Sequence, residues 1–254
     1  MHYRRLLNSA RQLKDTSTDA TTLRGRAPLD AITFGRETFL QLIKETLGEL
    51  ATGPADYRVT VIFDPSSLTE TLWGIPEVIP PNPDMVQVEI RRMIRNDPEI
   101  KSTRWVAERQ AAEQEKSPAS NEVILADAKG NLYEGLSSNF GVLQKSPQSG
   151  WSLLTAPKEL VLTGSIMELV KIAAKTLGMT VIEHLPQIDR LHDYQGAFIT
   201  STSRLLLPVS RILGEGGRVD VNSTNGDQEC MCLLKRLQAT TLQLILSRSI
   251  NLPD

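Results

Sequence analysis

The sequence predicts an α+β protein with two domains, and three observations support this. Residues 1–73 alternate between helical and strand patterns. Four prolines then crowd into residues 75–84, where they fix φ and remove backbone donors, so we expect the domain linker there. Beyond it, strand patterns dominate. We therefore expect a small α/β domain over residues 1–78 and a larger, strand-rich domain over residues 79–254.

The N-terminal domain is expected to hold two helices and a strand. Apolar side chains repeat at helical spacing over residues 2–14 and again over residues 33–50, and Gly53–Pro54 ends the second helix. The β-branched run at residues 58–63 predicts a strand, which Asp64–Pro65 closes.

The C-terminal domain is expected to be rich in strands. Its predicted strands cover residues 85–90, 122–127, 132–134, 180–182 and 196–200, and its predicted helices cover residues 103–115, 165–177 and 232–248. Gly178 is typical of the residue that ends a helix. Residues 214–228 are rich in Gly, Asn, Asp and Ser, which predicts a surface loop or hairpin.

Composition argues against several classes of partner. The 28 Lys and Arg nearly balance the 30 Asp and Glu, so the chain has no basic field for nucleic acid or an anionic membrane. No apolar run approaches the roughly 18 residues of a membrane span, and the N-terminus lacks the apolar centre of a signal peptide. A cytoplasmic protein is expected, with Cys230 and Cys232 as reduced thiols and no metal site.

The familiar catalytic motifs are absent from the sequence. It contains no phosphate-binding loop, no dinucleotide-binding glycine motif and no nucleophile elbow. Its three histidines, His2, His184 and His192, do not form a recognisable pair of nucleophile and base, so we interpret each as structural or exposed. Hydrolysis by a catalytic triad is therefore not favoured.

One ordered set of segments does indicate a family. Residues 122–127, EVILAD, and residues 130–140, GNLYEGLSSNF, together resemble the signature of the fold-type IV pyridoxal-phosphate enzymes. This family includes branched-chain and D-amino-acid aminotransferases and aminodeoxychorismate lyase. Residues 154–157, 162–164 and 198–209 are similar to further family segments and follow in family order. The resemblance implies a barrel-like sheet in the larger domain, pyridoxal 5'-phosphate as cofactor and a homodimer.

The resemblance also implies roles for individual residues. Lys101, which stands 33 residues before Glu134, would form the Schiff base with the cofactor, and this requires a lysine that can react as the free amine. Glu134 would pair with the pyridine nitrogen and keep the ring an electron sink. The remaining implied cofactor residues are Arg5, Ser138, Asn139, Gly164, Ser165, Ile166 and Thr202, and the implied substrate residues are Ser203 and Arg204. Without the resemblance, Lys101 reads as a solvated side chain and Glu134 as the exposed end of a strand.

Three more arginines precede Lys101. Arg91, Arg92 and Arg95 lie in and after the strand predicted at residues 85–90. A guanidinium there would suit a substrate carboxylate, although a basic solvated face is the favoured interpretation of all three.

Several departures from the family pattern leave the activity open. Ile166 stands where the family usually has a phosphate-binding threonine, and Val106 stands where the aminotransferases typically have tyrosine. The match begins at residue 2, so the resemblance implies that a strand and hairpin on the substrate side are missing. Three alternatives remain: an aminotransferase, a lyase that eliminates pyruvate from an amino-chorismate-like substrate, and a homologue with weakened or lost activity.

Overall fold

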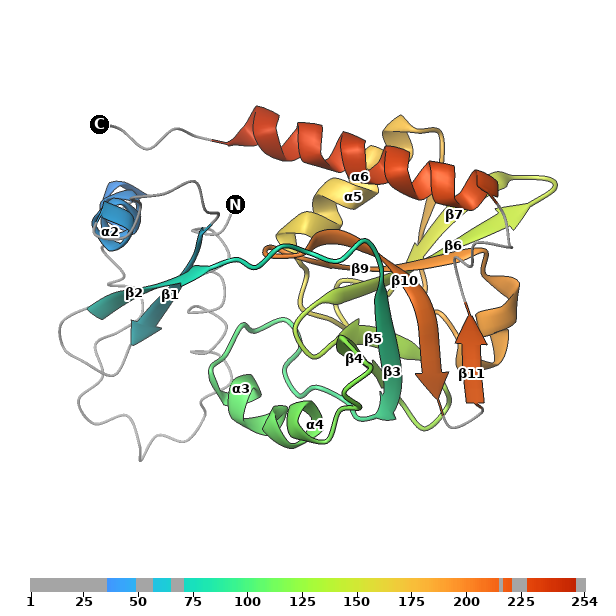
Figure 1. The fold of residues 1–254 in the computed structure, drawn as a ribbon, viewed down its shortest axis with the longest axis horizontal. Helices are drawn as coiled ribbons and strands as arrows, with labels where there is room; N and C mark the ends of the chain where they lie inside the picture. The colour runs from blue at the N-terminus through green and yellow to red at the C-terminus, as the bar shows by residue number, and fades with distance from the viewer. Residues whose placement is uncertain (1–35, 49–56, 65–70, 215–216, 221–227, 250–254) are drawn as a thin grey trace. The chain divides into compact units, whose positions relative to one another are not determined.

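The computed structural model describes residues 36–48, 57–64, 71–214, 217–220 and 228–249. The chain divides into two compact units between Pro81 and Asn82, and Figure 1 labels their elements. The helix expected over residues 2–14, and with it Arg5, lies outside the described residues.

The first unit contains one described helix and a two-stranded antiparallel sheet. Helix α2 (Arg36–Gly48) confirms the second predicted helix, and strand β1 (Tyr57–Asp64) confirms the predicted strand. Strand β2 (Thr71–Val78) pairs with β1 and runs through Pro76, which lies opposite Val59. The linker was expected over residues 75–84, but residues 75–78 form the end of β2. A proline is tolerated here because β2 has β1 on one side only within the described sheet.

The second unit is built on a closed ring of six strands. The ring contains β3 (Val86–Arg92), β4 (Glu122–Ala126), β5 (Leu132–Gly135), β6 (Asn139–Ser146), β9 (Gly196–Ser201) and β10 (Leu205–Gly214). It closes because β9 pairs with both β6 and β10, while β3 joins β10 to β4 in parallel register. Strands β7 (Gly150–Thr155) and β8 (Thr180–Glu183) extend the sheet from β6, and β11 (Gly217–Asp220) extends it from β10. This ring confirms the barrel-like sheet implied by the resemblance.

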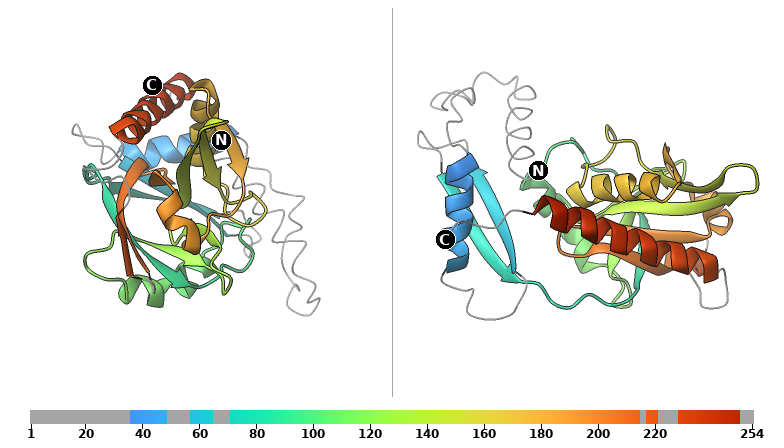
Figure 2. Two further views of the ribbon diagram at one scale, coloured as in Figure 1. Left: turned by 90° about the vertical axis from the view of Figure 1, so that its right-hand side faces the viewer. Right: turned by 90° about the horizontal axis from the view of Figure 1, so that it is seen from above.

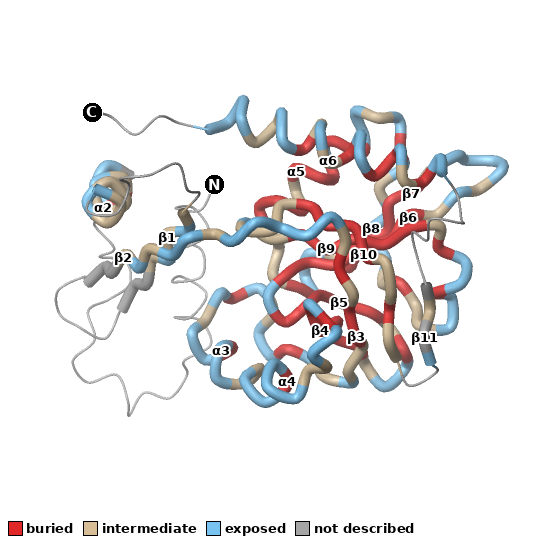
Figure 3. The backbone as a smooth tube through the Cα atoms, in the orientation of Figure 1, coloured by how far each residue is buried: buried red, intermediate tan, exposed pale blue. Residues whose placement is uncertain are grey.

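Alternation along the strands separates the hydrophobic residues into an inner and an outer core. Phe140 and Val142, two residues apart on β6, gather with Ile199 of β9 in one cluster within the ring. Their neighbours Leu143 and Phe198 point to the other face and pack with α5 (Ser165–Thr176) and α6 (Gln228–Arg248). Figure 2 shows these two helices side by side along the sheet. In Figure 3 the strands are largely buried while the outer side of α6 is exposed.

Several elements differ from the expectation, and strands β6, β7 and β10 were not predicted. The helix predicted over residues 103–115 is two short helices, α3 (Arg104–Glu108) and α4 (Gln110–Gln114), that meet at Arg109. The last helix begins at Gln228, four residues earlier than predicted. The segment expected to be a loop or hairpin does contain a hairpin, because β11 pairs antiparallel with β10 and Gly217 lies opposite Gly214. The short 3-10 helix at Ile188–Asp193 was not predicted. Among the described residues, no helix is both long and apolar enough to cross a membrane.

Candidate active site

Glu134 is a buried carboxylate near the end of β5, not an exposed strand end. It is 3% exposed. The backbone N–H of Leu162 donates to its Oε2 at 3.2 Å, and Nη1 of Arg95 lies 3.5 Å from its Oε1. An ionised carboxylate is costly to bury unless an opposite charge and hydrogen bonds accompany it, and Glu134 has both.

Arg95 links Glu134 to the segment that carries Lys101. Arg95 is 7% exposed, and its Nη2 donates to the carbonyl of Ile100 at 2.6 Å. The guanidinium carbon lies 5.1 Å from the centre of the Trp105 ring, which is a cation–π distance. Burial lowers the pKa of Arg95, against the opposing effect of the Glu134 charge. One guanidinium group thus fixes the backbone next to Lys101 beside Glu134, while Lys101 itself is exposed.

The helices after Lys101 are fastened to the turn after Glu134. The carbonyl of Leu136 accepts hydrogen bonds from Nε1 of Trp105 at 3.0 Å and from Nη1 of Arg109 at 2.6 Å. Trp105 is buried on α3, and Arg109 stands where α3 gives way to α4. The break in the predicted helix therefore coincides with a contact that holds these helices against the turn.

Asn139 fixes the start of α5. Its Nδ2 donates to the carbonyl of Leu162 at 2.8 Å, and a Cβ on Gly164 would lie only 2.0 Å from its Oδ1. Gly164 precedes α5 and provides no side-chain cap, so the first-turn N–H groups of α5 have no side-chain partner from that residue. The start of this helix is therefore suited to an anion.

Two buried hydroxyl groups flank Asn139. Ser165 follows Gly164 directly, and Thr200 lies opposite Asn139 in the pairing of β6 with β9. Within the described part of the chain, neither Ser165 Oγ nor Thr200 Oγ1 has a hydrogen-bond partner. Buried polar groups are rarely left in this state, so a ligand with acceptor atoms would fit beside them.

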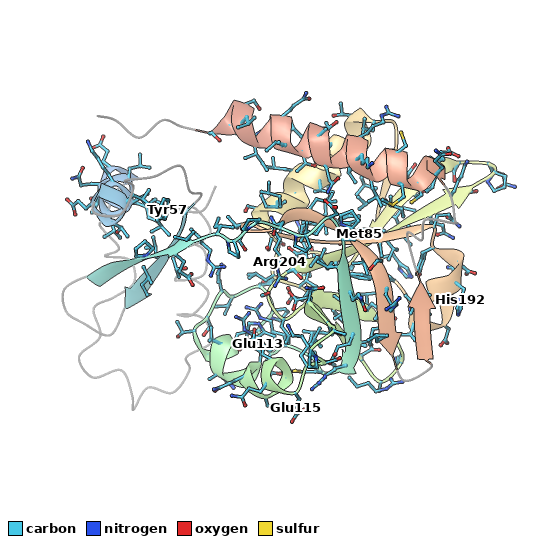
Figure 4. All side chains as sticks on the ribbon, viewed as in Figure 1. Tyr57, Met85, Glu113, Glu115, His192 and Arg204 are labelled. Atoms are coloured by element: carbon cyan, nitrogen blue, oxygen red, sulfur yellow. The ribbon has the colours of Figure 1, made fainter. Side chains whose placement is uncertain are left out.

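The turn between β9 and β10 carries Thr202, Ser203 and Arg204. Thr202 is exposed, and the backbone N–H of Arg204 donates to Ser201 Oγ at 3.2 Å. Figure 4 labels Arg204. Its Nη1 donates to Oε2 of Glu122 at 2.7 Å, so one of its donors already has a carboxylate partner.

The structure brings most of the predicted residues into two groups. The turn between β5 and β6 and the start of α5 carry the first group, which contains Glu134, Ser138, Asn139, Gly164, Ser165 and Ile166. The β9–β10 turn carries the second group, Thr202, Ser203 and Arg204. The side chain of Ile166 packs in the outer core, so only the backbone N–H of this residue is left for the cofactor binding expected of it.

The three arginines before Lys101 separate into two kinds. Arg91 pairs with Glu89 and Glu115, and Arg92 donates to the carbonyls of Asp127 and Ala128, which agrees with a surface role for both. Arg95 is buried instead, so the basic-face interpretation is wrong for this residue. Its burial could not be deduced from the alternation of β3, because Arg95 follows that strand.

A comparison with protein-family models finds a match to "Amino-transferase class IV" over residues 1–212. The chain belongs to the class IV aminotransferase family. Members of this family are pyridoxal-phosphate enzymes, and the barrel described above is the fold-type IV architecture. A search of curated proteins finds no match.

Solved structures of class IV proteins are similar to this chain throughout its length. The branched-chain amino acid aminotransferase of Escherichia coli is 16% identical with a TM-score of 0.69, and the match covers 98% of this chain and 79% of that one. A hypothetical aminotransferase from Mycobacterium tuberculosis in its PLP-bound form is 17% identical with a TM-score of 0.68, covering 94% of this chain and 81% of that one. A protein from Legionella pneumophila assigned as a 4-amino-4-deoxychorismate lyase is 17% identical with a TM-score of 0.66, covering 95% and 84%. At these identities the matches establish the shared fold.

The donor set of this class IV protein fits the family's cofactor. A buried carboxylate, Glu134, suits a protonated ring nitrogen, and the uncapped start of α5 with the hydroxyl of Ser165 suits a phosphate. Sequence reasoning missed Glu122 and Trp105 as supporting residues. Glu122 is the first residue of the family signature, and its position there was the available signal.

Proposed function

We propose that this class IV protein is an aminotransferase that acts on an amino acid and holds pyridoxal phosphate covalently through Nζ of Lys101. The bridge made by Arg95 carries this proposal. By binding both the Ile100 carbonyl and the Glu134 carboxylate, Arg95 keeps the lysine segment near the carboxylate that we assign to the ring nitrogen. When bound, pyridoxal phosphate supplies the electron sink that stabilises negative charge at the substrate Cα.

Glu134 has the role of keeping the ring nitrogen protonated. An ionised carboxylate can do this, and the nearby positive charge of Arg95 favours the ionised form of Glu134. The hydrogen bond from Leu162 N–H to Oε2 holds the carboxylate in place from the other side. The charge and orientation of Glu134 are thus both provided by its neighbours.

The phosphate would lie against the start of α5. The N–H groups of Ser165 and Ile166 and the hydroxyls of Ser165 and Thr202 are the donors that we assign to it. Loss of a threonine hydroxyl at position 166 removes one hydrogen bond to a charged group, a cost of about 1.5–3 kcal/mol. Arg5 is the cationic partner that the family motif implies.

The substrate side of the site would be formed by the β9–β10 turn and by Lys101. Nζ of Lys101 would move the proton between the substrate Cα and its neighbouring atoms as a general base and acid. Ser203 and Arg204 are assigned to the substrate carboxylate. Because Nη1 of Arg204 is bound to Glu122, its other guanidinium donors would make this contact.

A lyase that eliminates pyruvate is the second candidate. Position 106 supports it, because Val106 offers no hydroxyl where the aminotransferases typically have tyrosine, and the Legionella neighbour is assigned to this activity. A lyase would use the same Lys101 and Glu134. A homodimer and a cytoplasmic location are part of the same proposal. The homodimer is the assembly that the family resemblance implies, and the location is the one that the composition favours.

The decisive experiment is covalent labelling. The purified protein is incubated with pyridoxal phosphate, reduced with borohydride and mapped by peptide mass spectrometry, with Lys101→Ala beside Lys158→Ala. Lys158 is a matched control because it is exposed and its nearest carboxylate, on Glu159, lies 3.9 Å away. We expect one labelled peptide containing Lys101, lost in Lys101→Ala and retained in Lys158→Ala. Labelling spread over surface lysines would refute the proposal.

Activity assays then separate the two candidates. An aminotransferase releases a keto acid from an amino acid and passes the amino group to a second keto acid. A lyase releases pyruvate from aminodeoxychorismate without an amino acceptor. Formation of neither product by a protein labelled at Lys101 would identify a cofactor-binding homologue with altered activity.

A further inference from the structure

A buried carboxylate outside the proposed cofactor contacts joins two separate turns of the site. Glu122 begins β4 and is 3% exposed. Its Oε2 accepts hydrogen bonds from Ser137 Oγ at 2.8 Å, from Ser138 Oγ at 2.9 Å and from Nη1 of Arg204 at 2.7 Å. Its Oε1 accepts the backbone N–H of Val123 at 3.1 Å.

The first turn that Glu122 holds connects Glu134 to Asn139. The two serines come from this turn, and the backbone N–H of Gly135 donates to the carbonyl of Ser138 at 2.7 Å. Packing here is close, because a Cβ on Gly135 would lie 2.3 Å from Ser138 Oγ and 2.9 Å from Cγ of Glu122. The Glu122 side chain therefore holds this turn through hydrogen bonds and through close packing.

The second turn connects β9 to β10 and carries Thr202. Arg204 reaches Glu122 from this turn, across 82 positions of sequence. Leu205, which follows Arg204, has φ of +55°, a left-handed conformation that is unfavourable for leucine. Such a conformation persists only where the surrounding contacts impose it. The residue before Leu205 is held by two such contacts, the ion pair of Arg204 with Glu122 and the bond from Arg204 N–H to Ser201 Oγ.

We propose that Glu122 is a positioning residue that couples the Glu134 turn to the Thr202 turn, so that the ring end and the phosphate end of the cofactor site are set by one carboxylate. The effect of Glu122 on the cofactor site rests on the proposed function. Its structural part, the coupling of the two turns, stands on the contacts alone. In some proteins a buried ion pair specifies the geometry and adds little stability, and this is the role assigned to Glu122 here.

A matched pair of variants tests the coupling in the protein without added cofactor. Glu122→Gln removes the charge and keeps the shape. Glu89→Gln makes the same change in another buried carboxylate, which also pairs with an arginine but binds the N–H of Ser117 instead of either turn. Amide hydrogen exchange is followed by mass spectrometry in peptides covering residues 135–139 and 201–205.

We expect exchange to rise about tenfold or more in both turns of Glu122→Gln, the change that corresponds to losing a hydrogen bond to a charged group. Glu89→Gln should leave both turns unchanged. The affinity for pyridoxal phosphate should fall in Glu122→Gln and not in Glu89→Gln. Faster exchange in one turn alone, or equal effects of the two variants, would overturn the coupling.

A second variant keeps the test valid if Glu122→Gln does not fold. Arg204→Met removes the partner on the Thr202 turn. Arg204 is partly exposed, and the two serine hydroxyls and the Val123 N–H still bind the Glu122 carboxylate, so we expect this variant to fold. Coupling through Glu122 predicts faster exchange at Ser137 and Ser138, which belong to the other turn. An effect confined to residues 201–205 would overturn the proposal.

The two proposals fail in different ways. If Lys101 is not labelled by pyridoxal phosphate but both turns respond to Glu122→Gln, the coupling stands and the proposed function is wrong. If Lys101 is labelled but exchange in both turns is unchanged by Glu122→Gln, the proposed function stands and the coupling is wrong.

Discussion

Replacing Gly164 by alanine tests the packing that fixes the start of α5. Gly164 has φ of −76° and ψ of 136°, which any residue adopts, so alanine brings no backbone strain. Its Cβ would however lie 2.0 Å from Oδ1 and 3.2 Å from Cγ of Asn139. Asn139 is 6% exposed and donates to the Leu162 carbonyl, so it cannot turn aside without losing that bond. The substitution must therefore disturb the segment that leads into α5.

The expected cost follows from three contributions. Overpacking a buried site costs about 1–3 kcal/mol, and losing the Asn139 hydrogen bond costs about 1 kcal/mol. Replacing glycine by alanine returns about 0.4–1 kcal/mol by restricting the unfolded chain. We expect Gly164→Ala to lower the free energy of unfolding by about 2 kcal/mol, which corresponds to a fall in Tm of about 4–8 °C for a unit of this size.

Urea unfolding followed by circular dichroism measures this effect, provided that the m-value is unchanged. The same substitution in an Asn139→Ala background is the control, because it removes the atoms that the new Cβ would meet. There the cost of Gly164→Ala should fall to about 0.5 kcal/mol or less. An equal cost in both backgrounds, or full stability of the single variant, would refute the steric argument.

Three further predictions concern the barrel and its charges. Gly141→Ala should destabilise the protein by about 1–3 kcal/mol because its Cβ would lie 2.6 Å from a buried phenylalanine ring on β9, whereas Gly214→Ala, with its nearest atom 3.7 Å away, should change the midpoint of urea unfolding little. Burial would raise the pKa of Asp127, but hydrogen bonds from four donors outweigh it and lower the pKa, so Asp127→Asn should be less stable than the parent at pH 7. That difference should vanish as the pH falls below about 4 and through the lowered pKa, as thermal melts across pH would reveal. Arg95→Met should cost about 3–5 kcal/mol by leaving the Glu134 charge buried, and adding Glu134→Gln should recover part of it in the same urea assay.

Each of these predictions has a result that contradicts it. Equal effects of the two glycine variants would show that the ring moves freely. A stability difference for Asp127→Asn that does not shrink as the pH falls below about 4 would show that the charge of the carboxylate does not matter. A double variant no more stable than Arg95→Met would show that the arginine acts by packing against Trp105 rather than through its charge.

Local patterns in the sequence determined most of the elements of the fold. Alternating or β-branched runs predicted β1, β3, β4, β5, β8 and β9, and helical spacing predicted α2, α5 and α6, because these periodicities reflect which side of an element is buried. Strands β6, β7 and β10 were not predicted. Where a long-range contact competes with the local pattern, the prediction failed. The helix expected over residues 103–115 breaks at Arg109, whose side chain reaches the Leu136 carbonyl. A strand runs through Pro76 because a two-stranded sheet demands no hydrogen bond from its outer side.

The family signature likewise identified the candidate cofactor residues Lys101, Glu134 and Asn139 from the sequence alone, since their order and spacing are properties of the chain. Only the tertiary structure decided what surrounds them. Closure of the barrel brings Arg204 to Glu122 across 82 positions and Leu162 to Glu134 across 28. No periodicity encodes such pairs, because a contact between distant segments depends on how the strands pair and on which side chains the interior must neutralise. The sequence therefore determines which charged and polar side chains are available, and the barrel determines which of them lie close enough to bind one another.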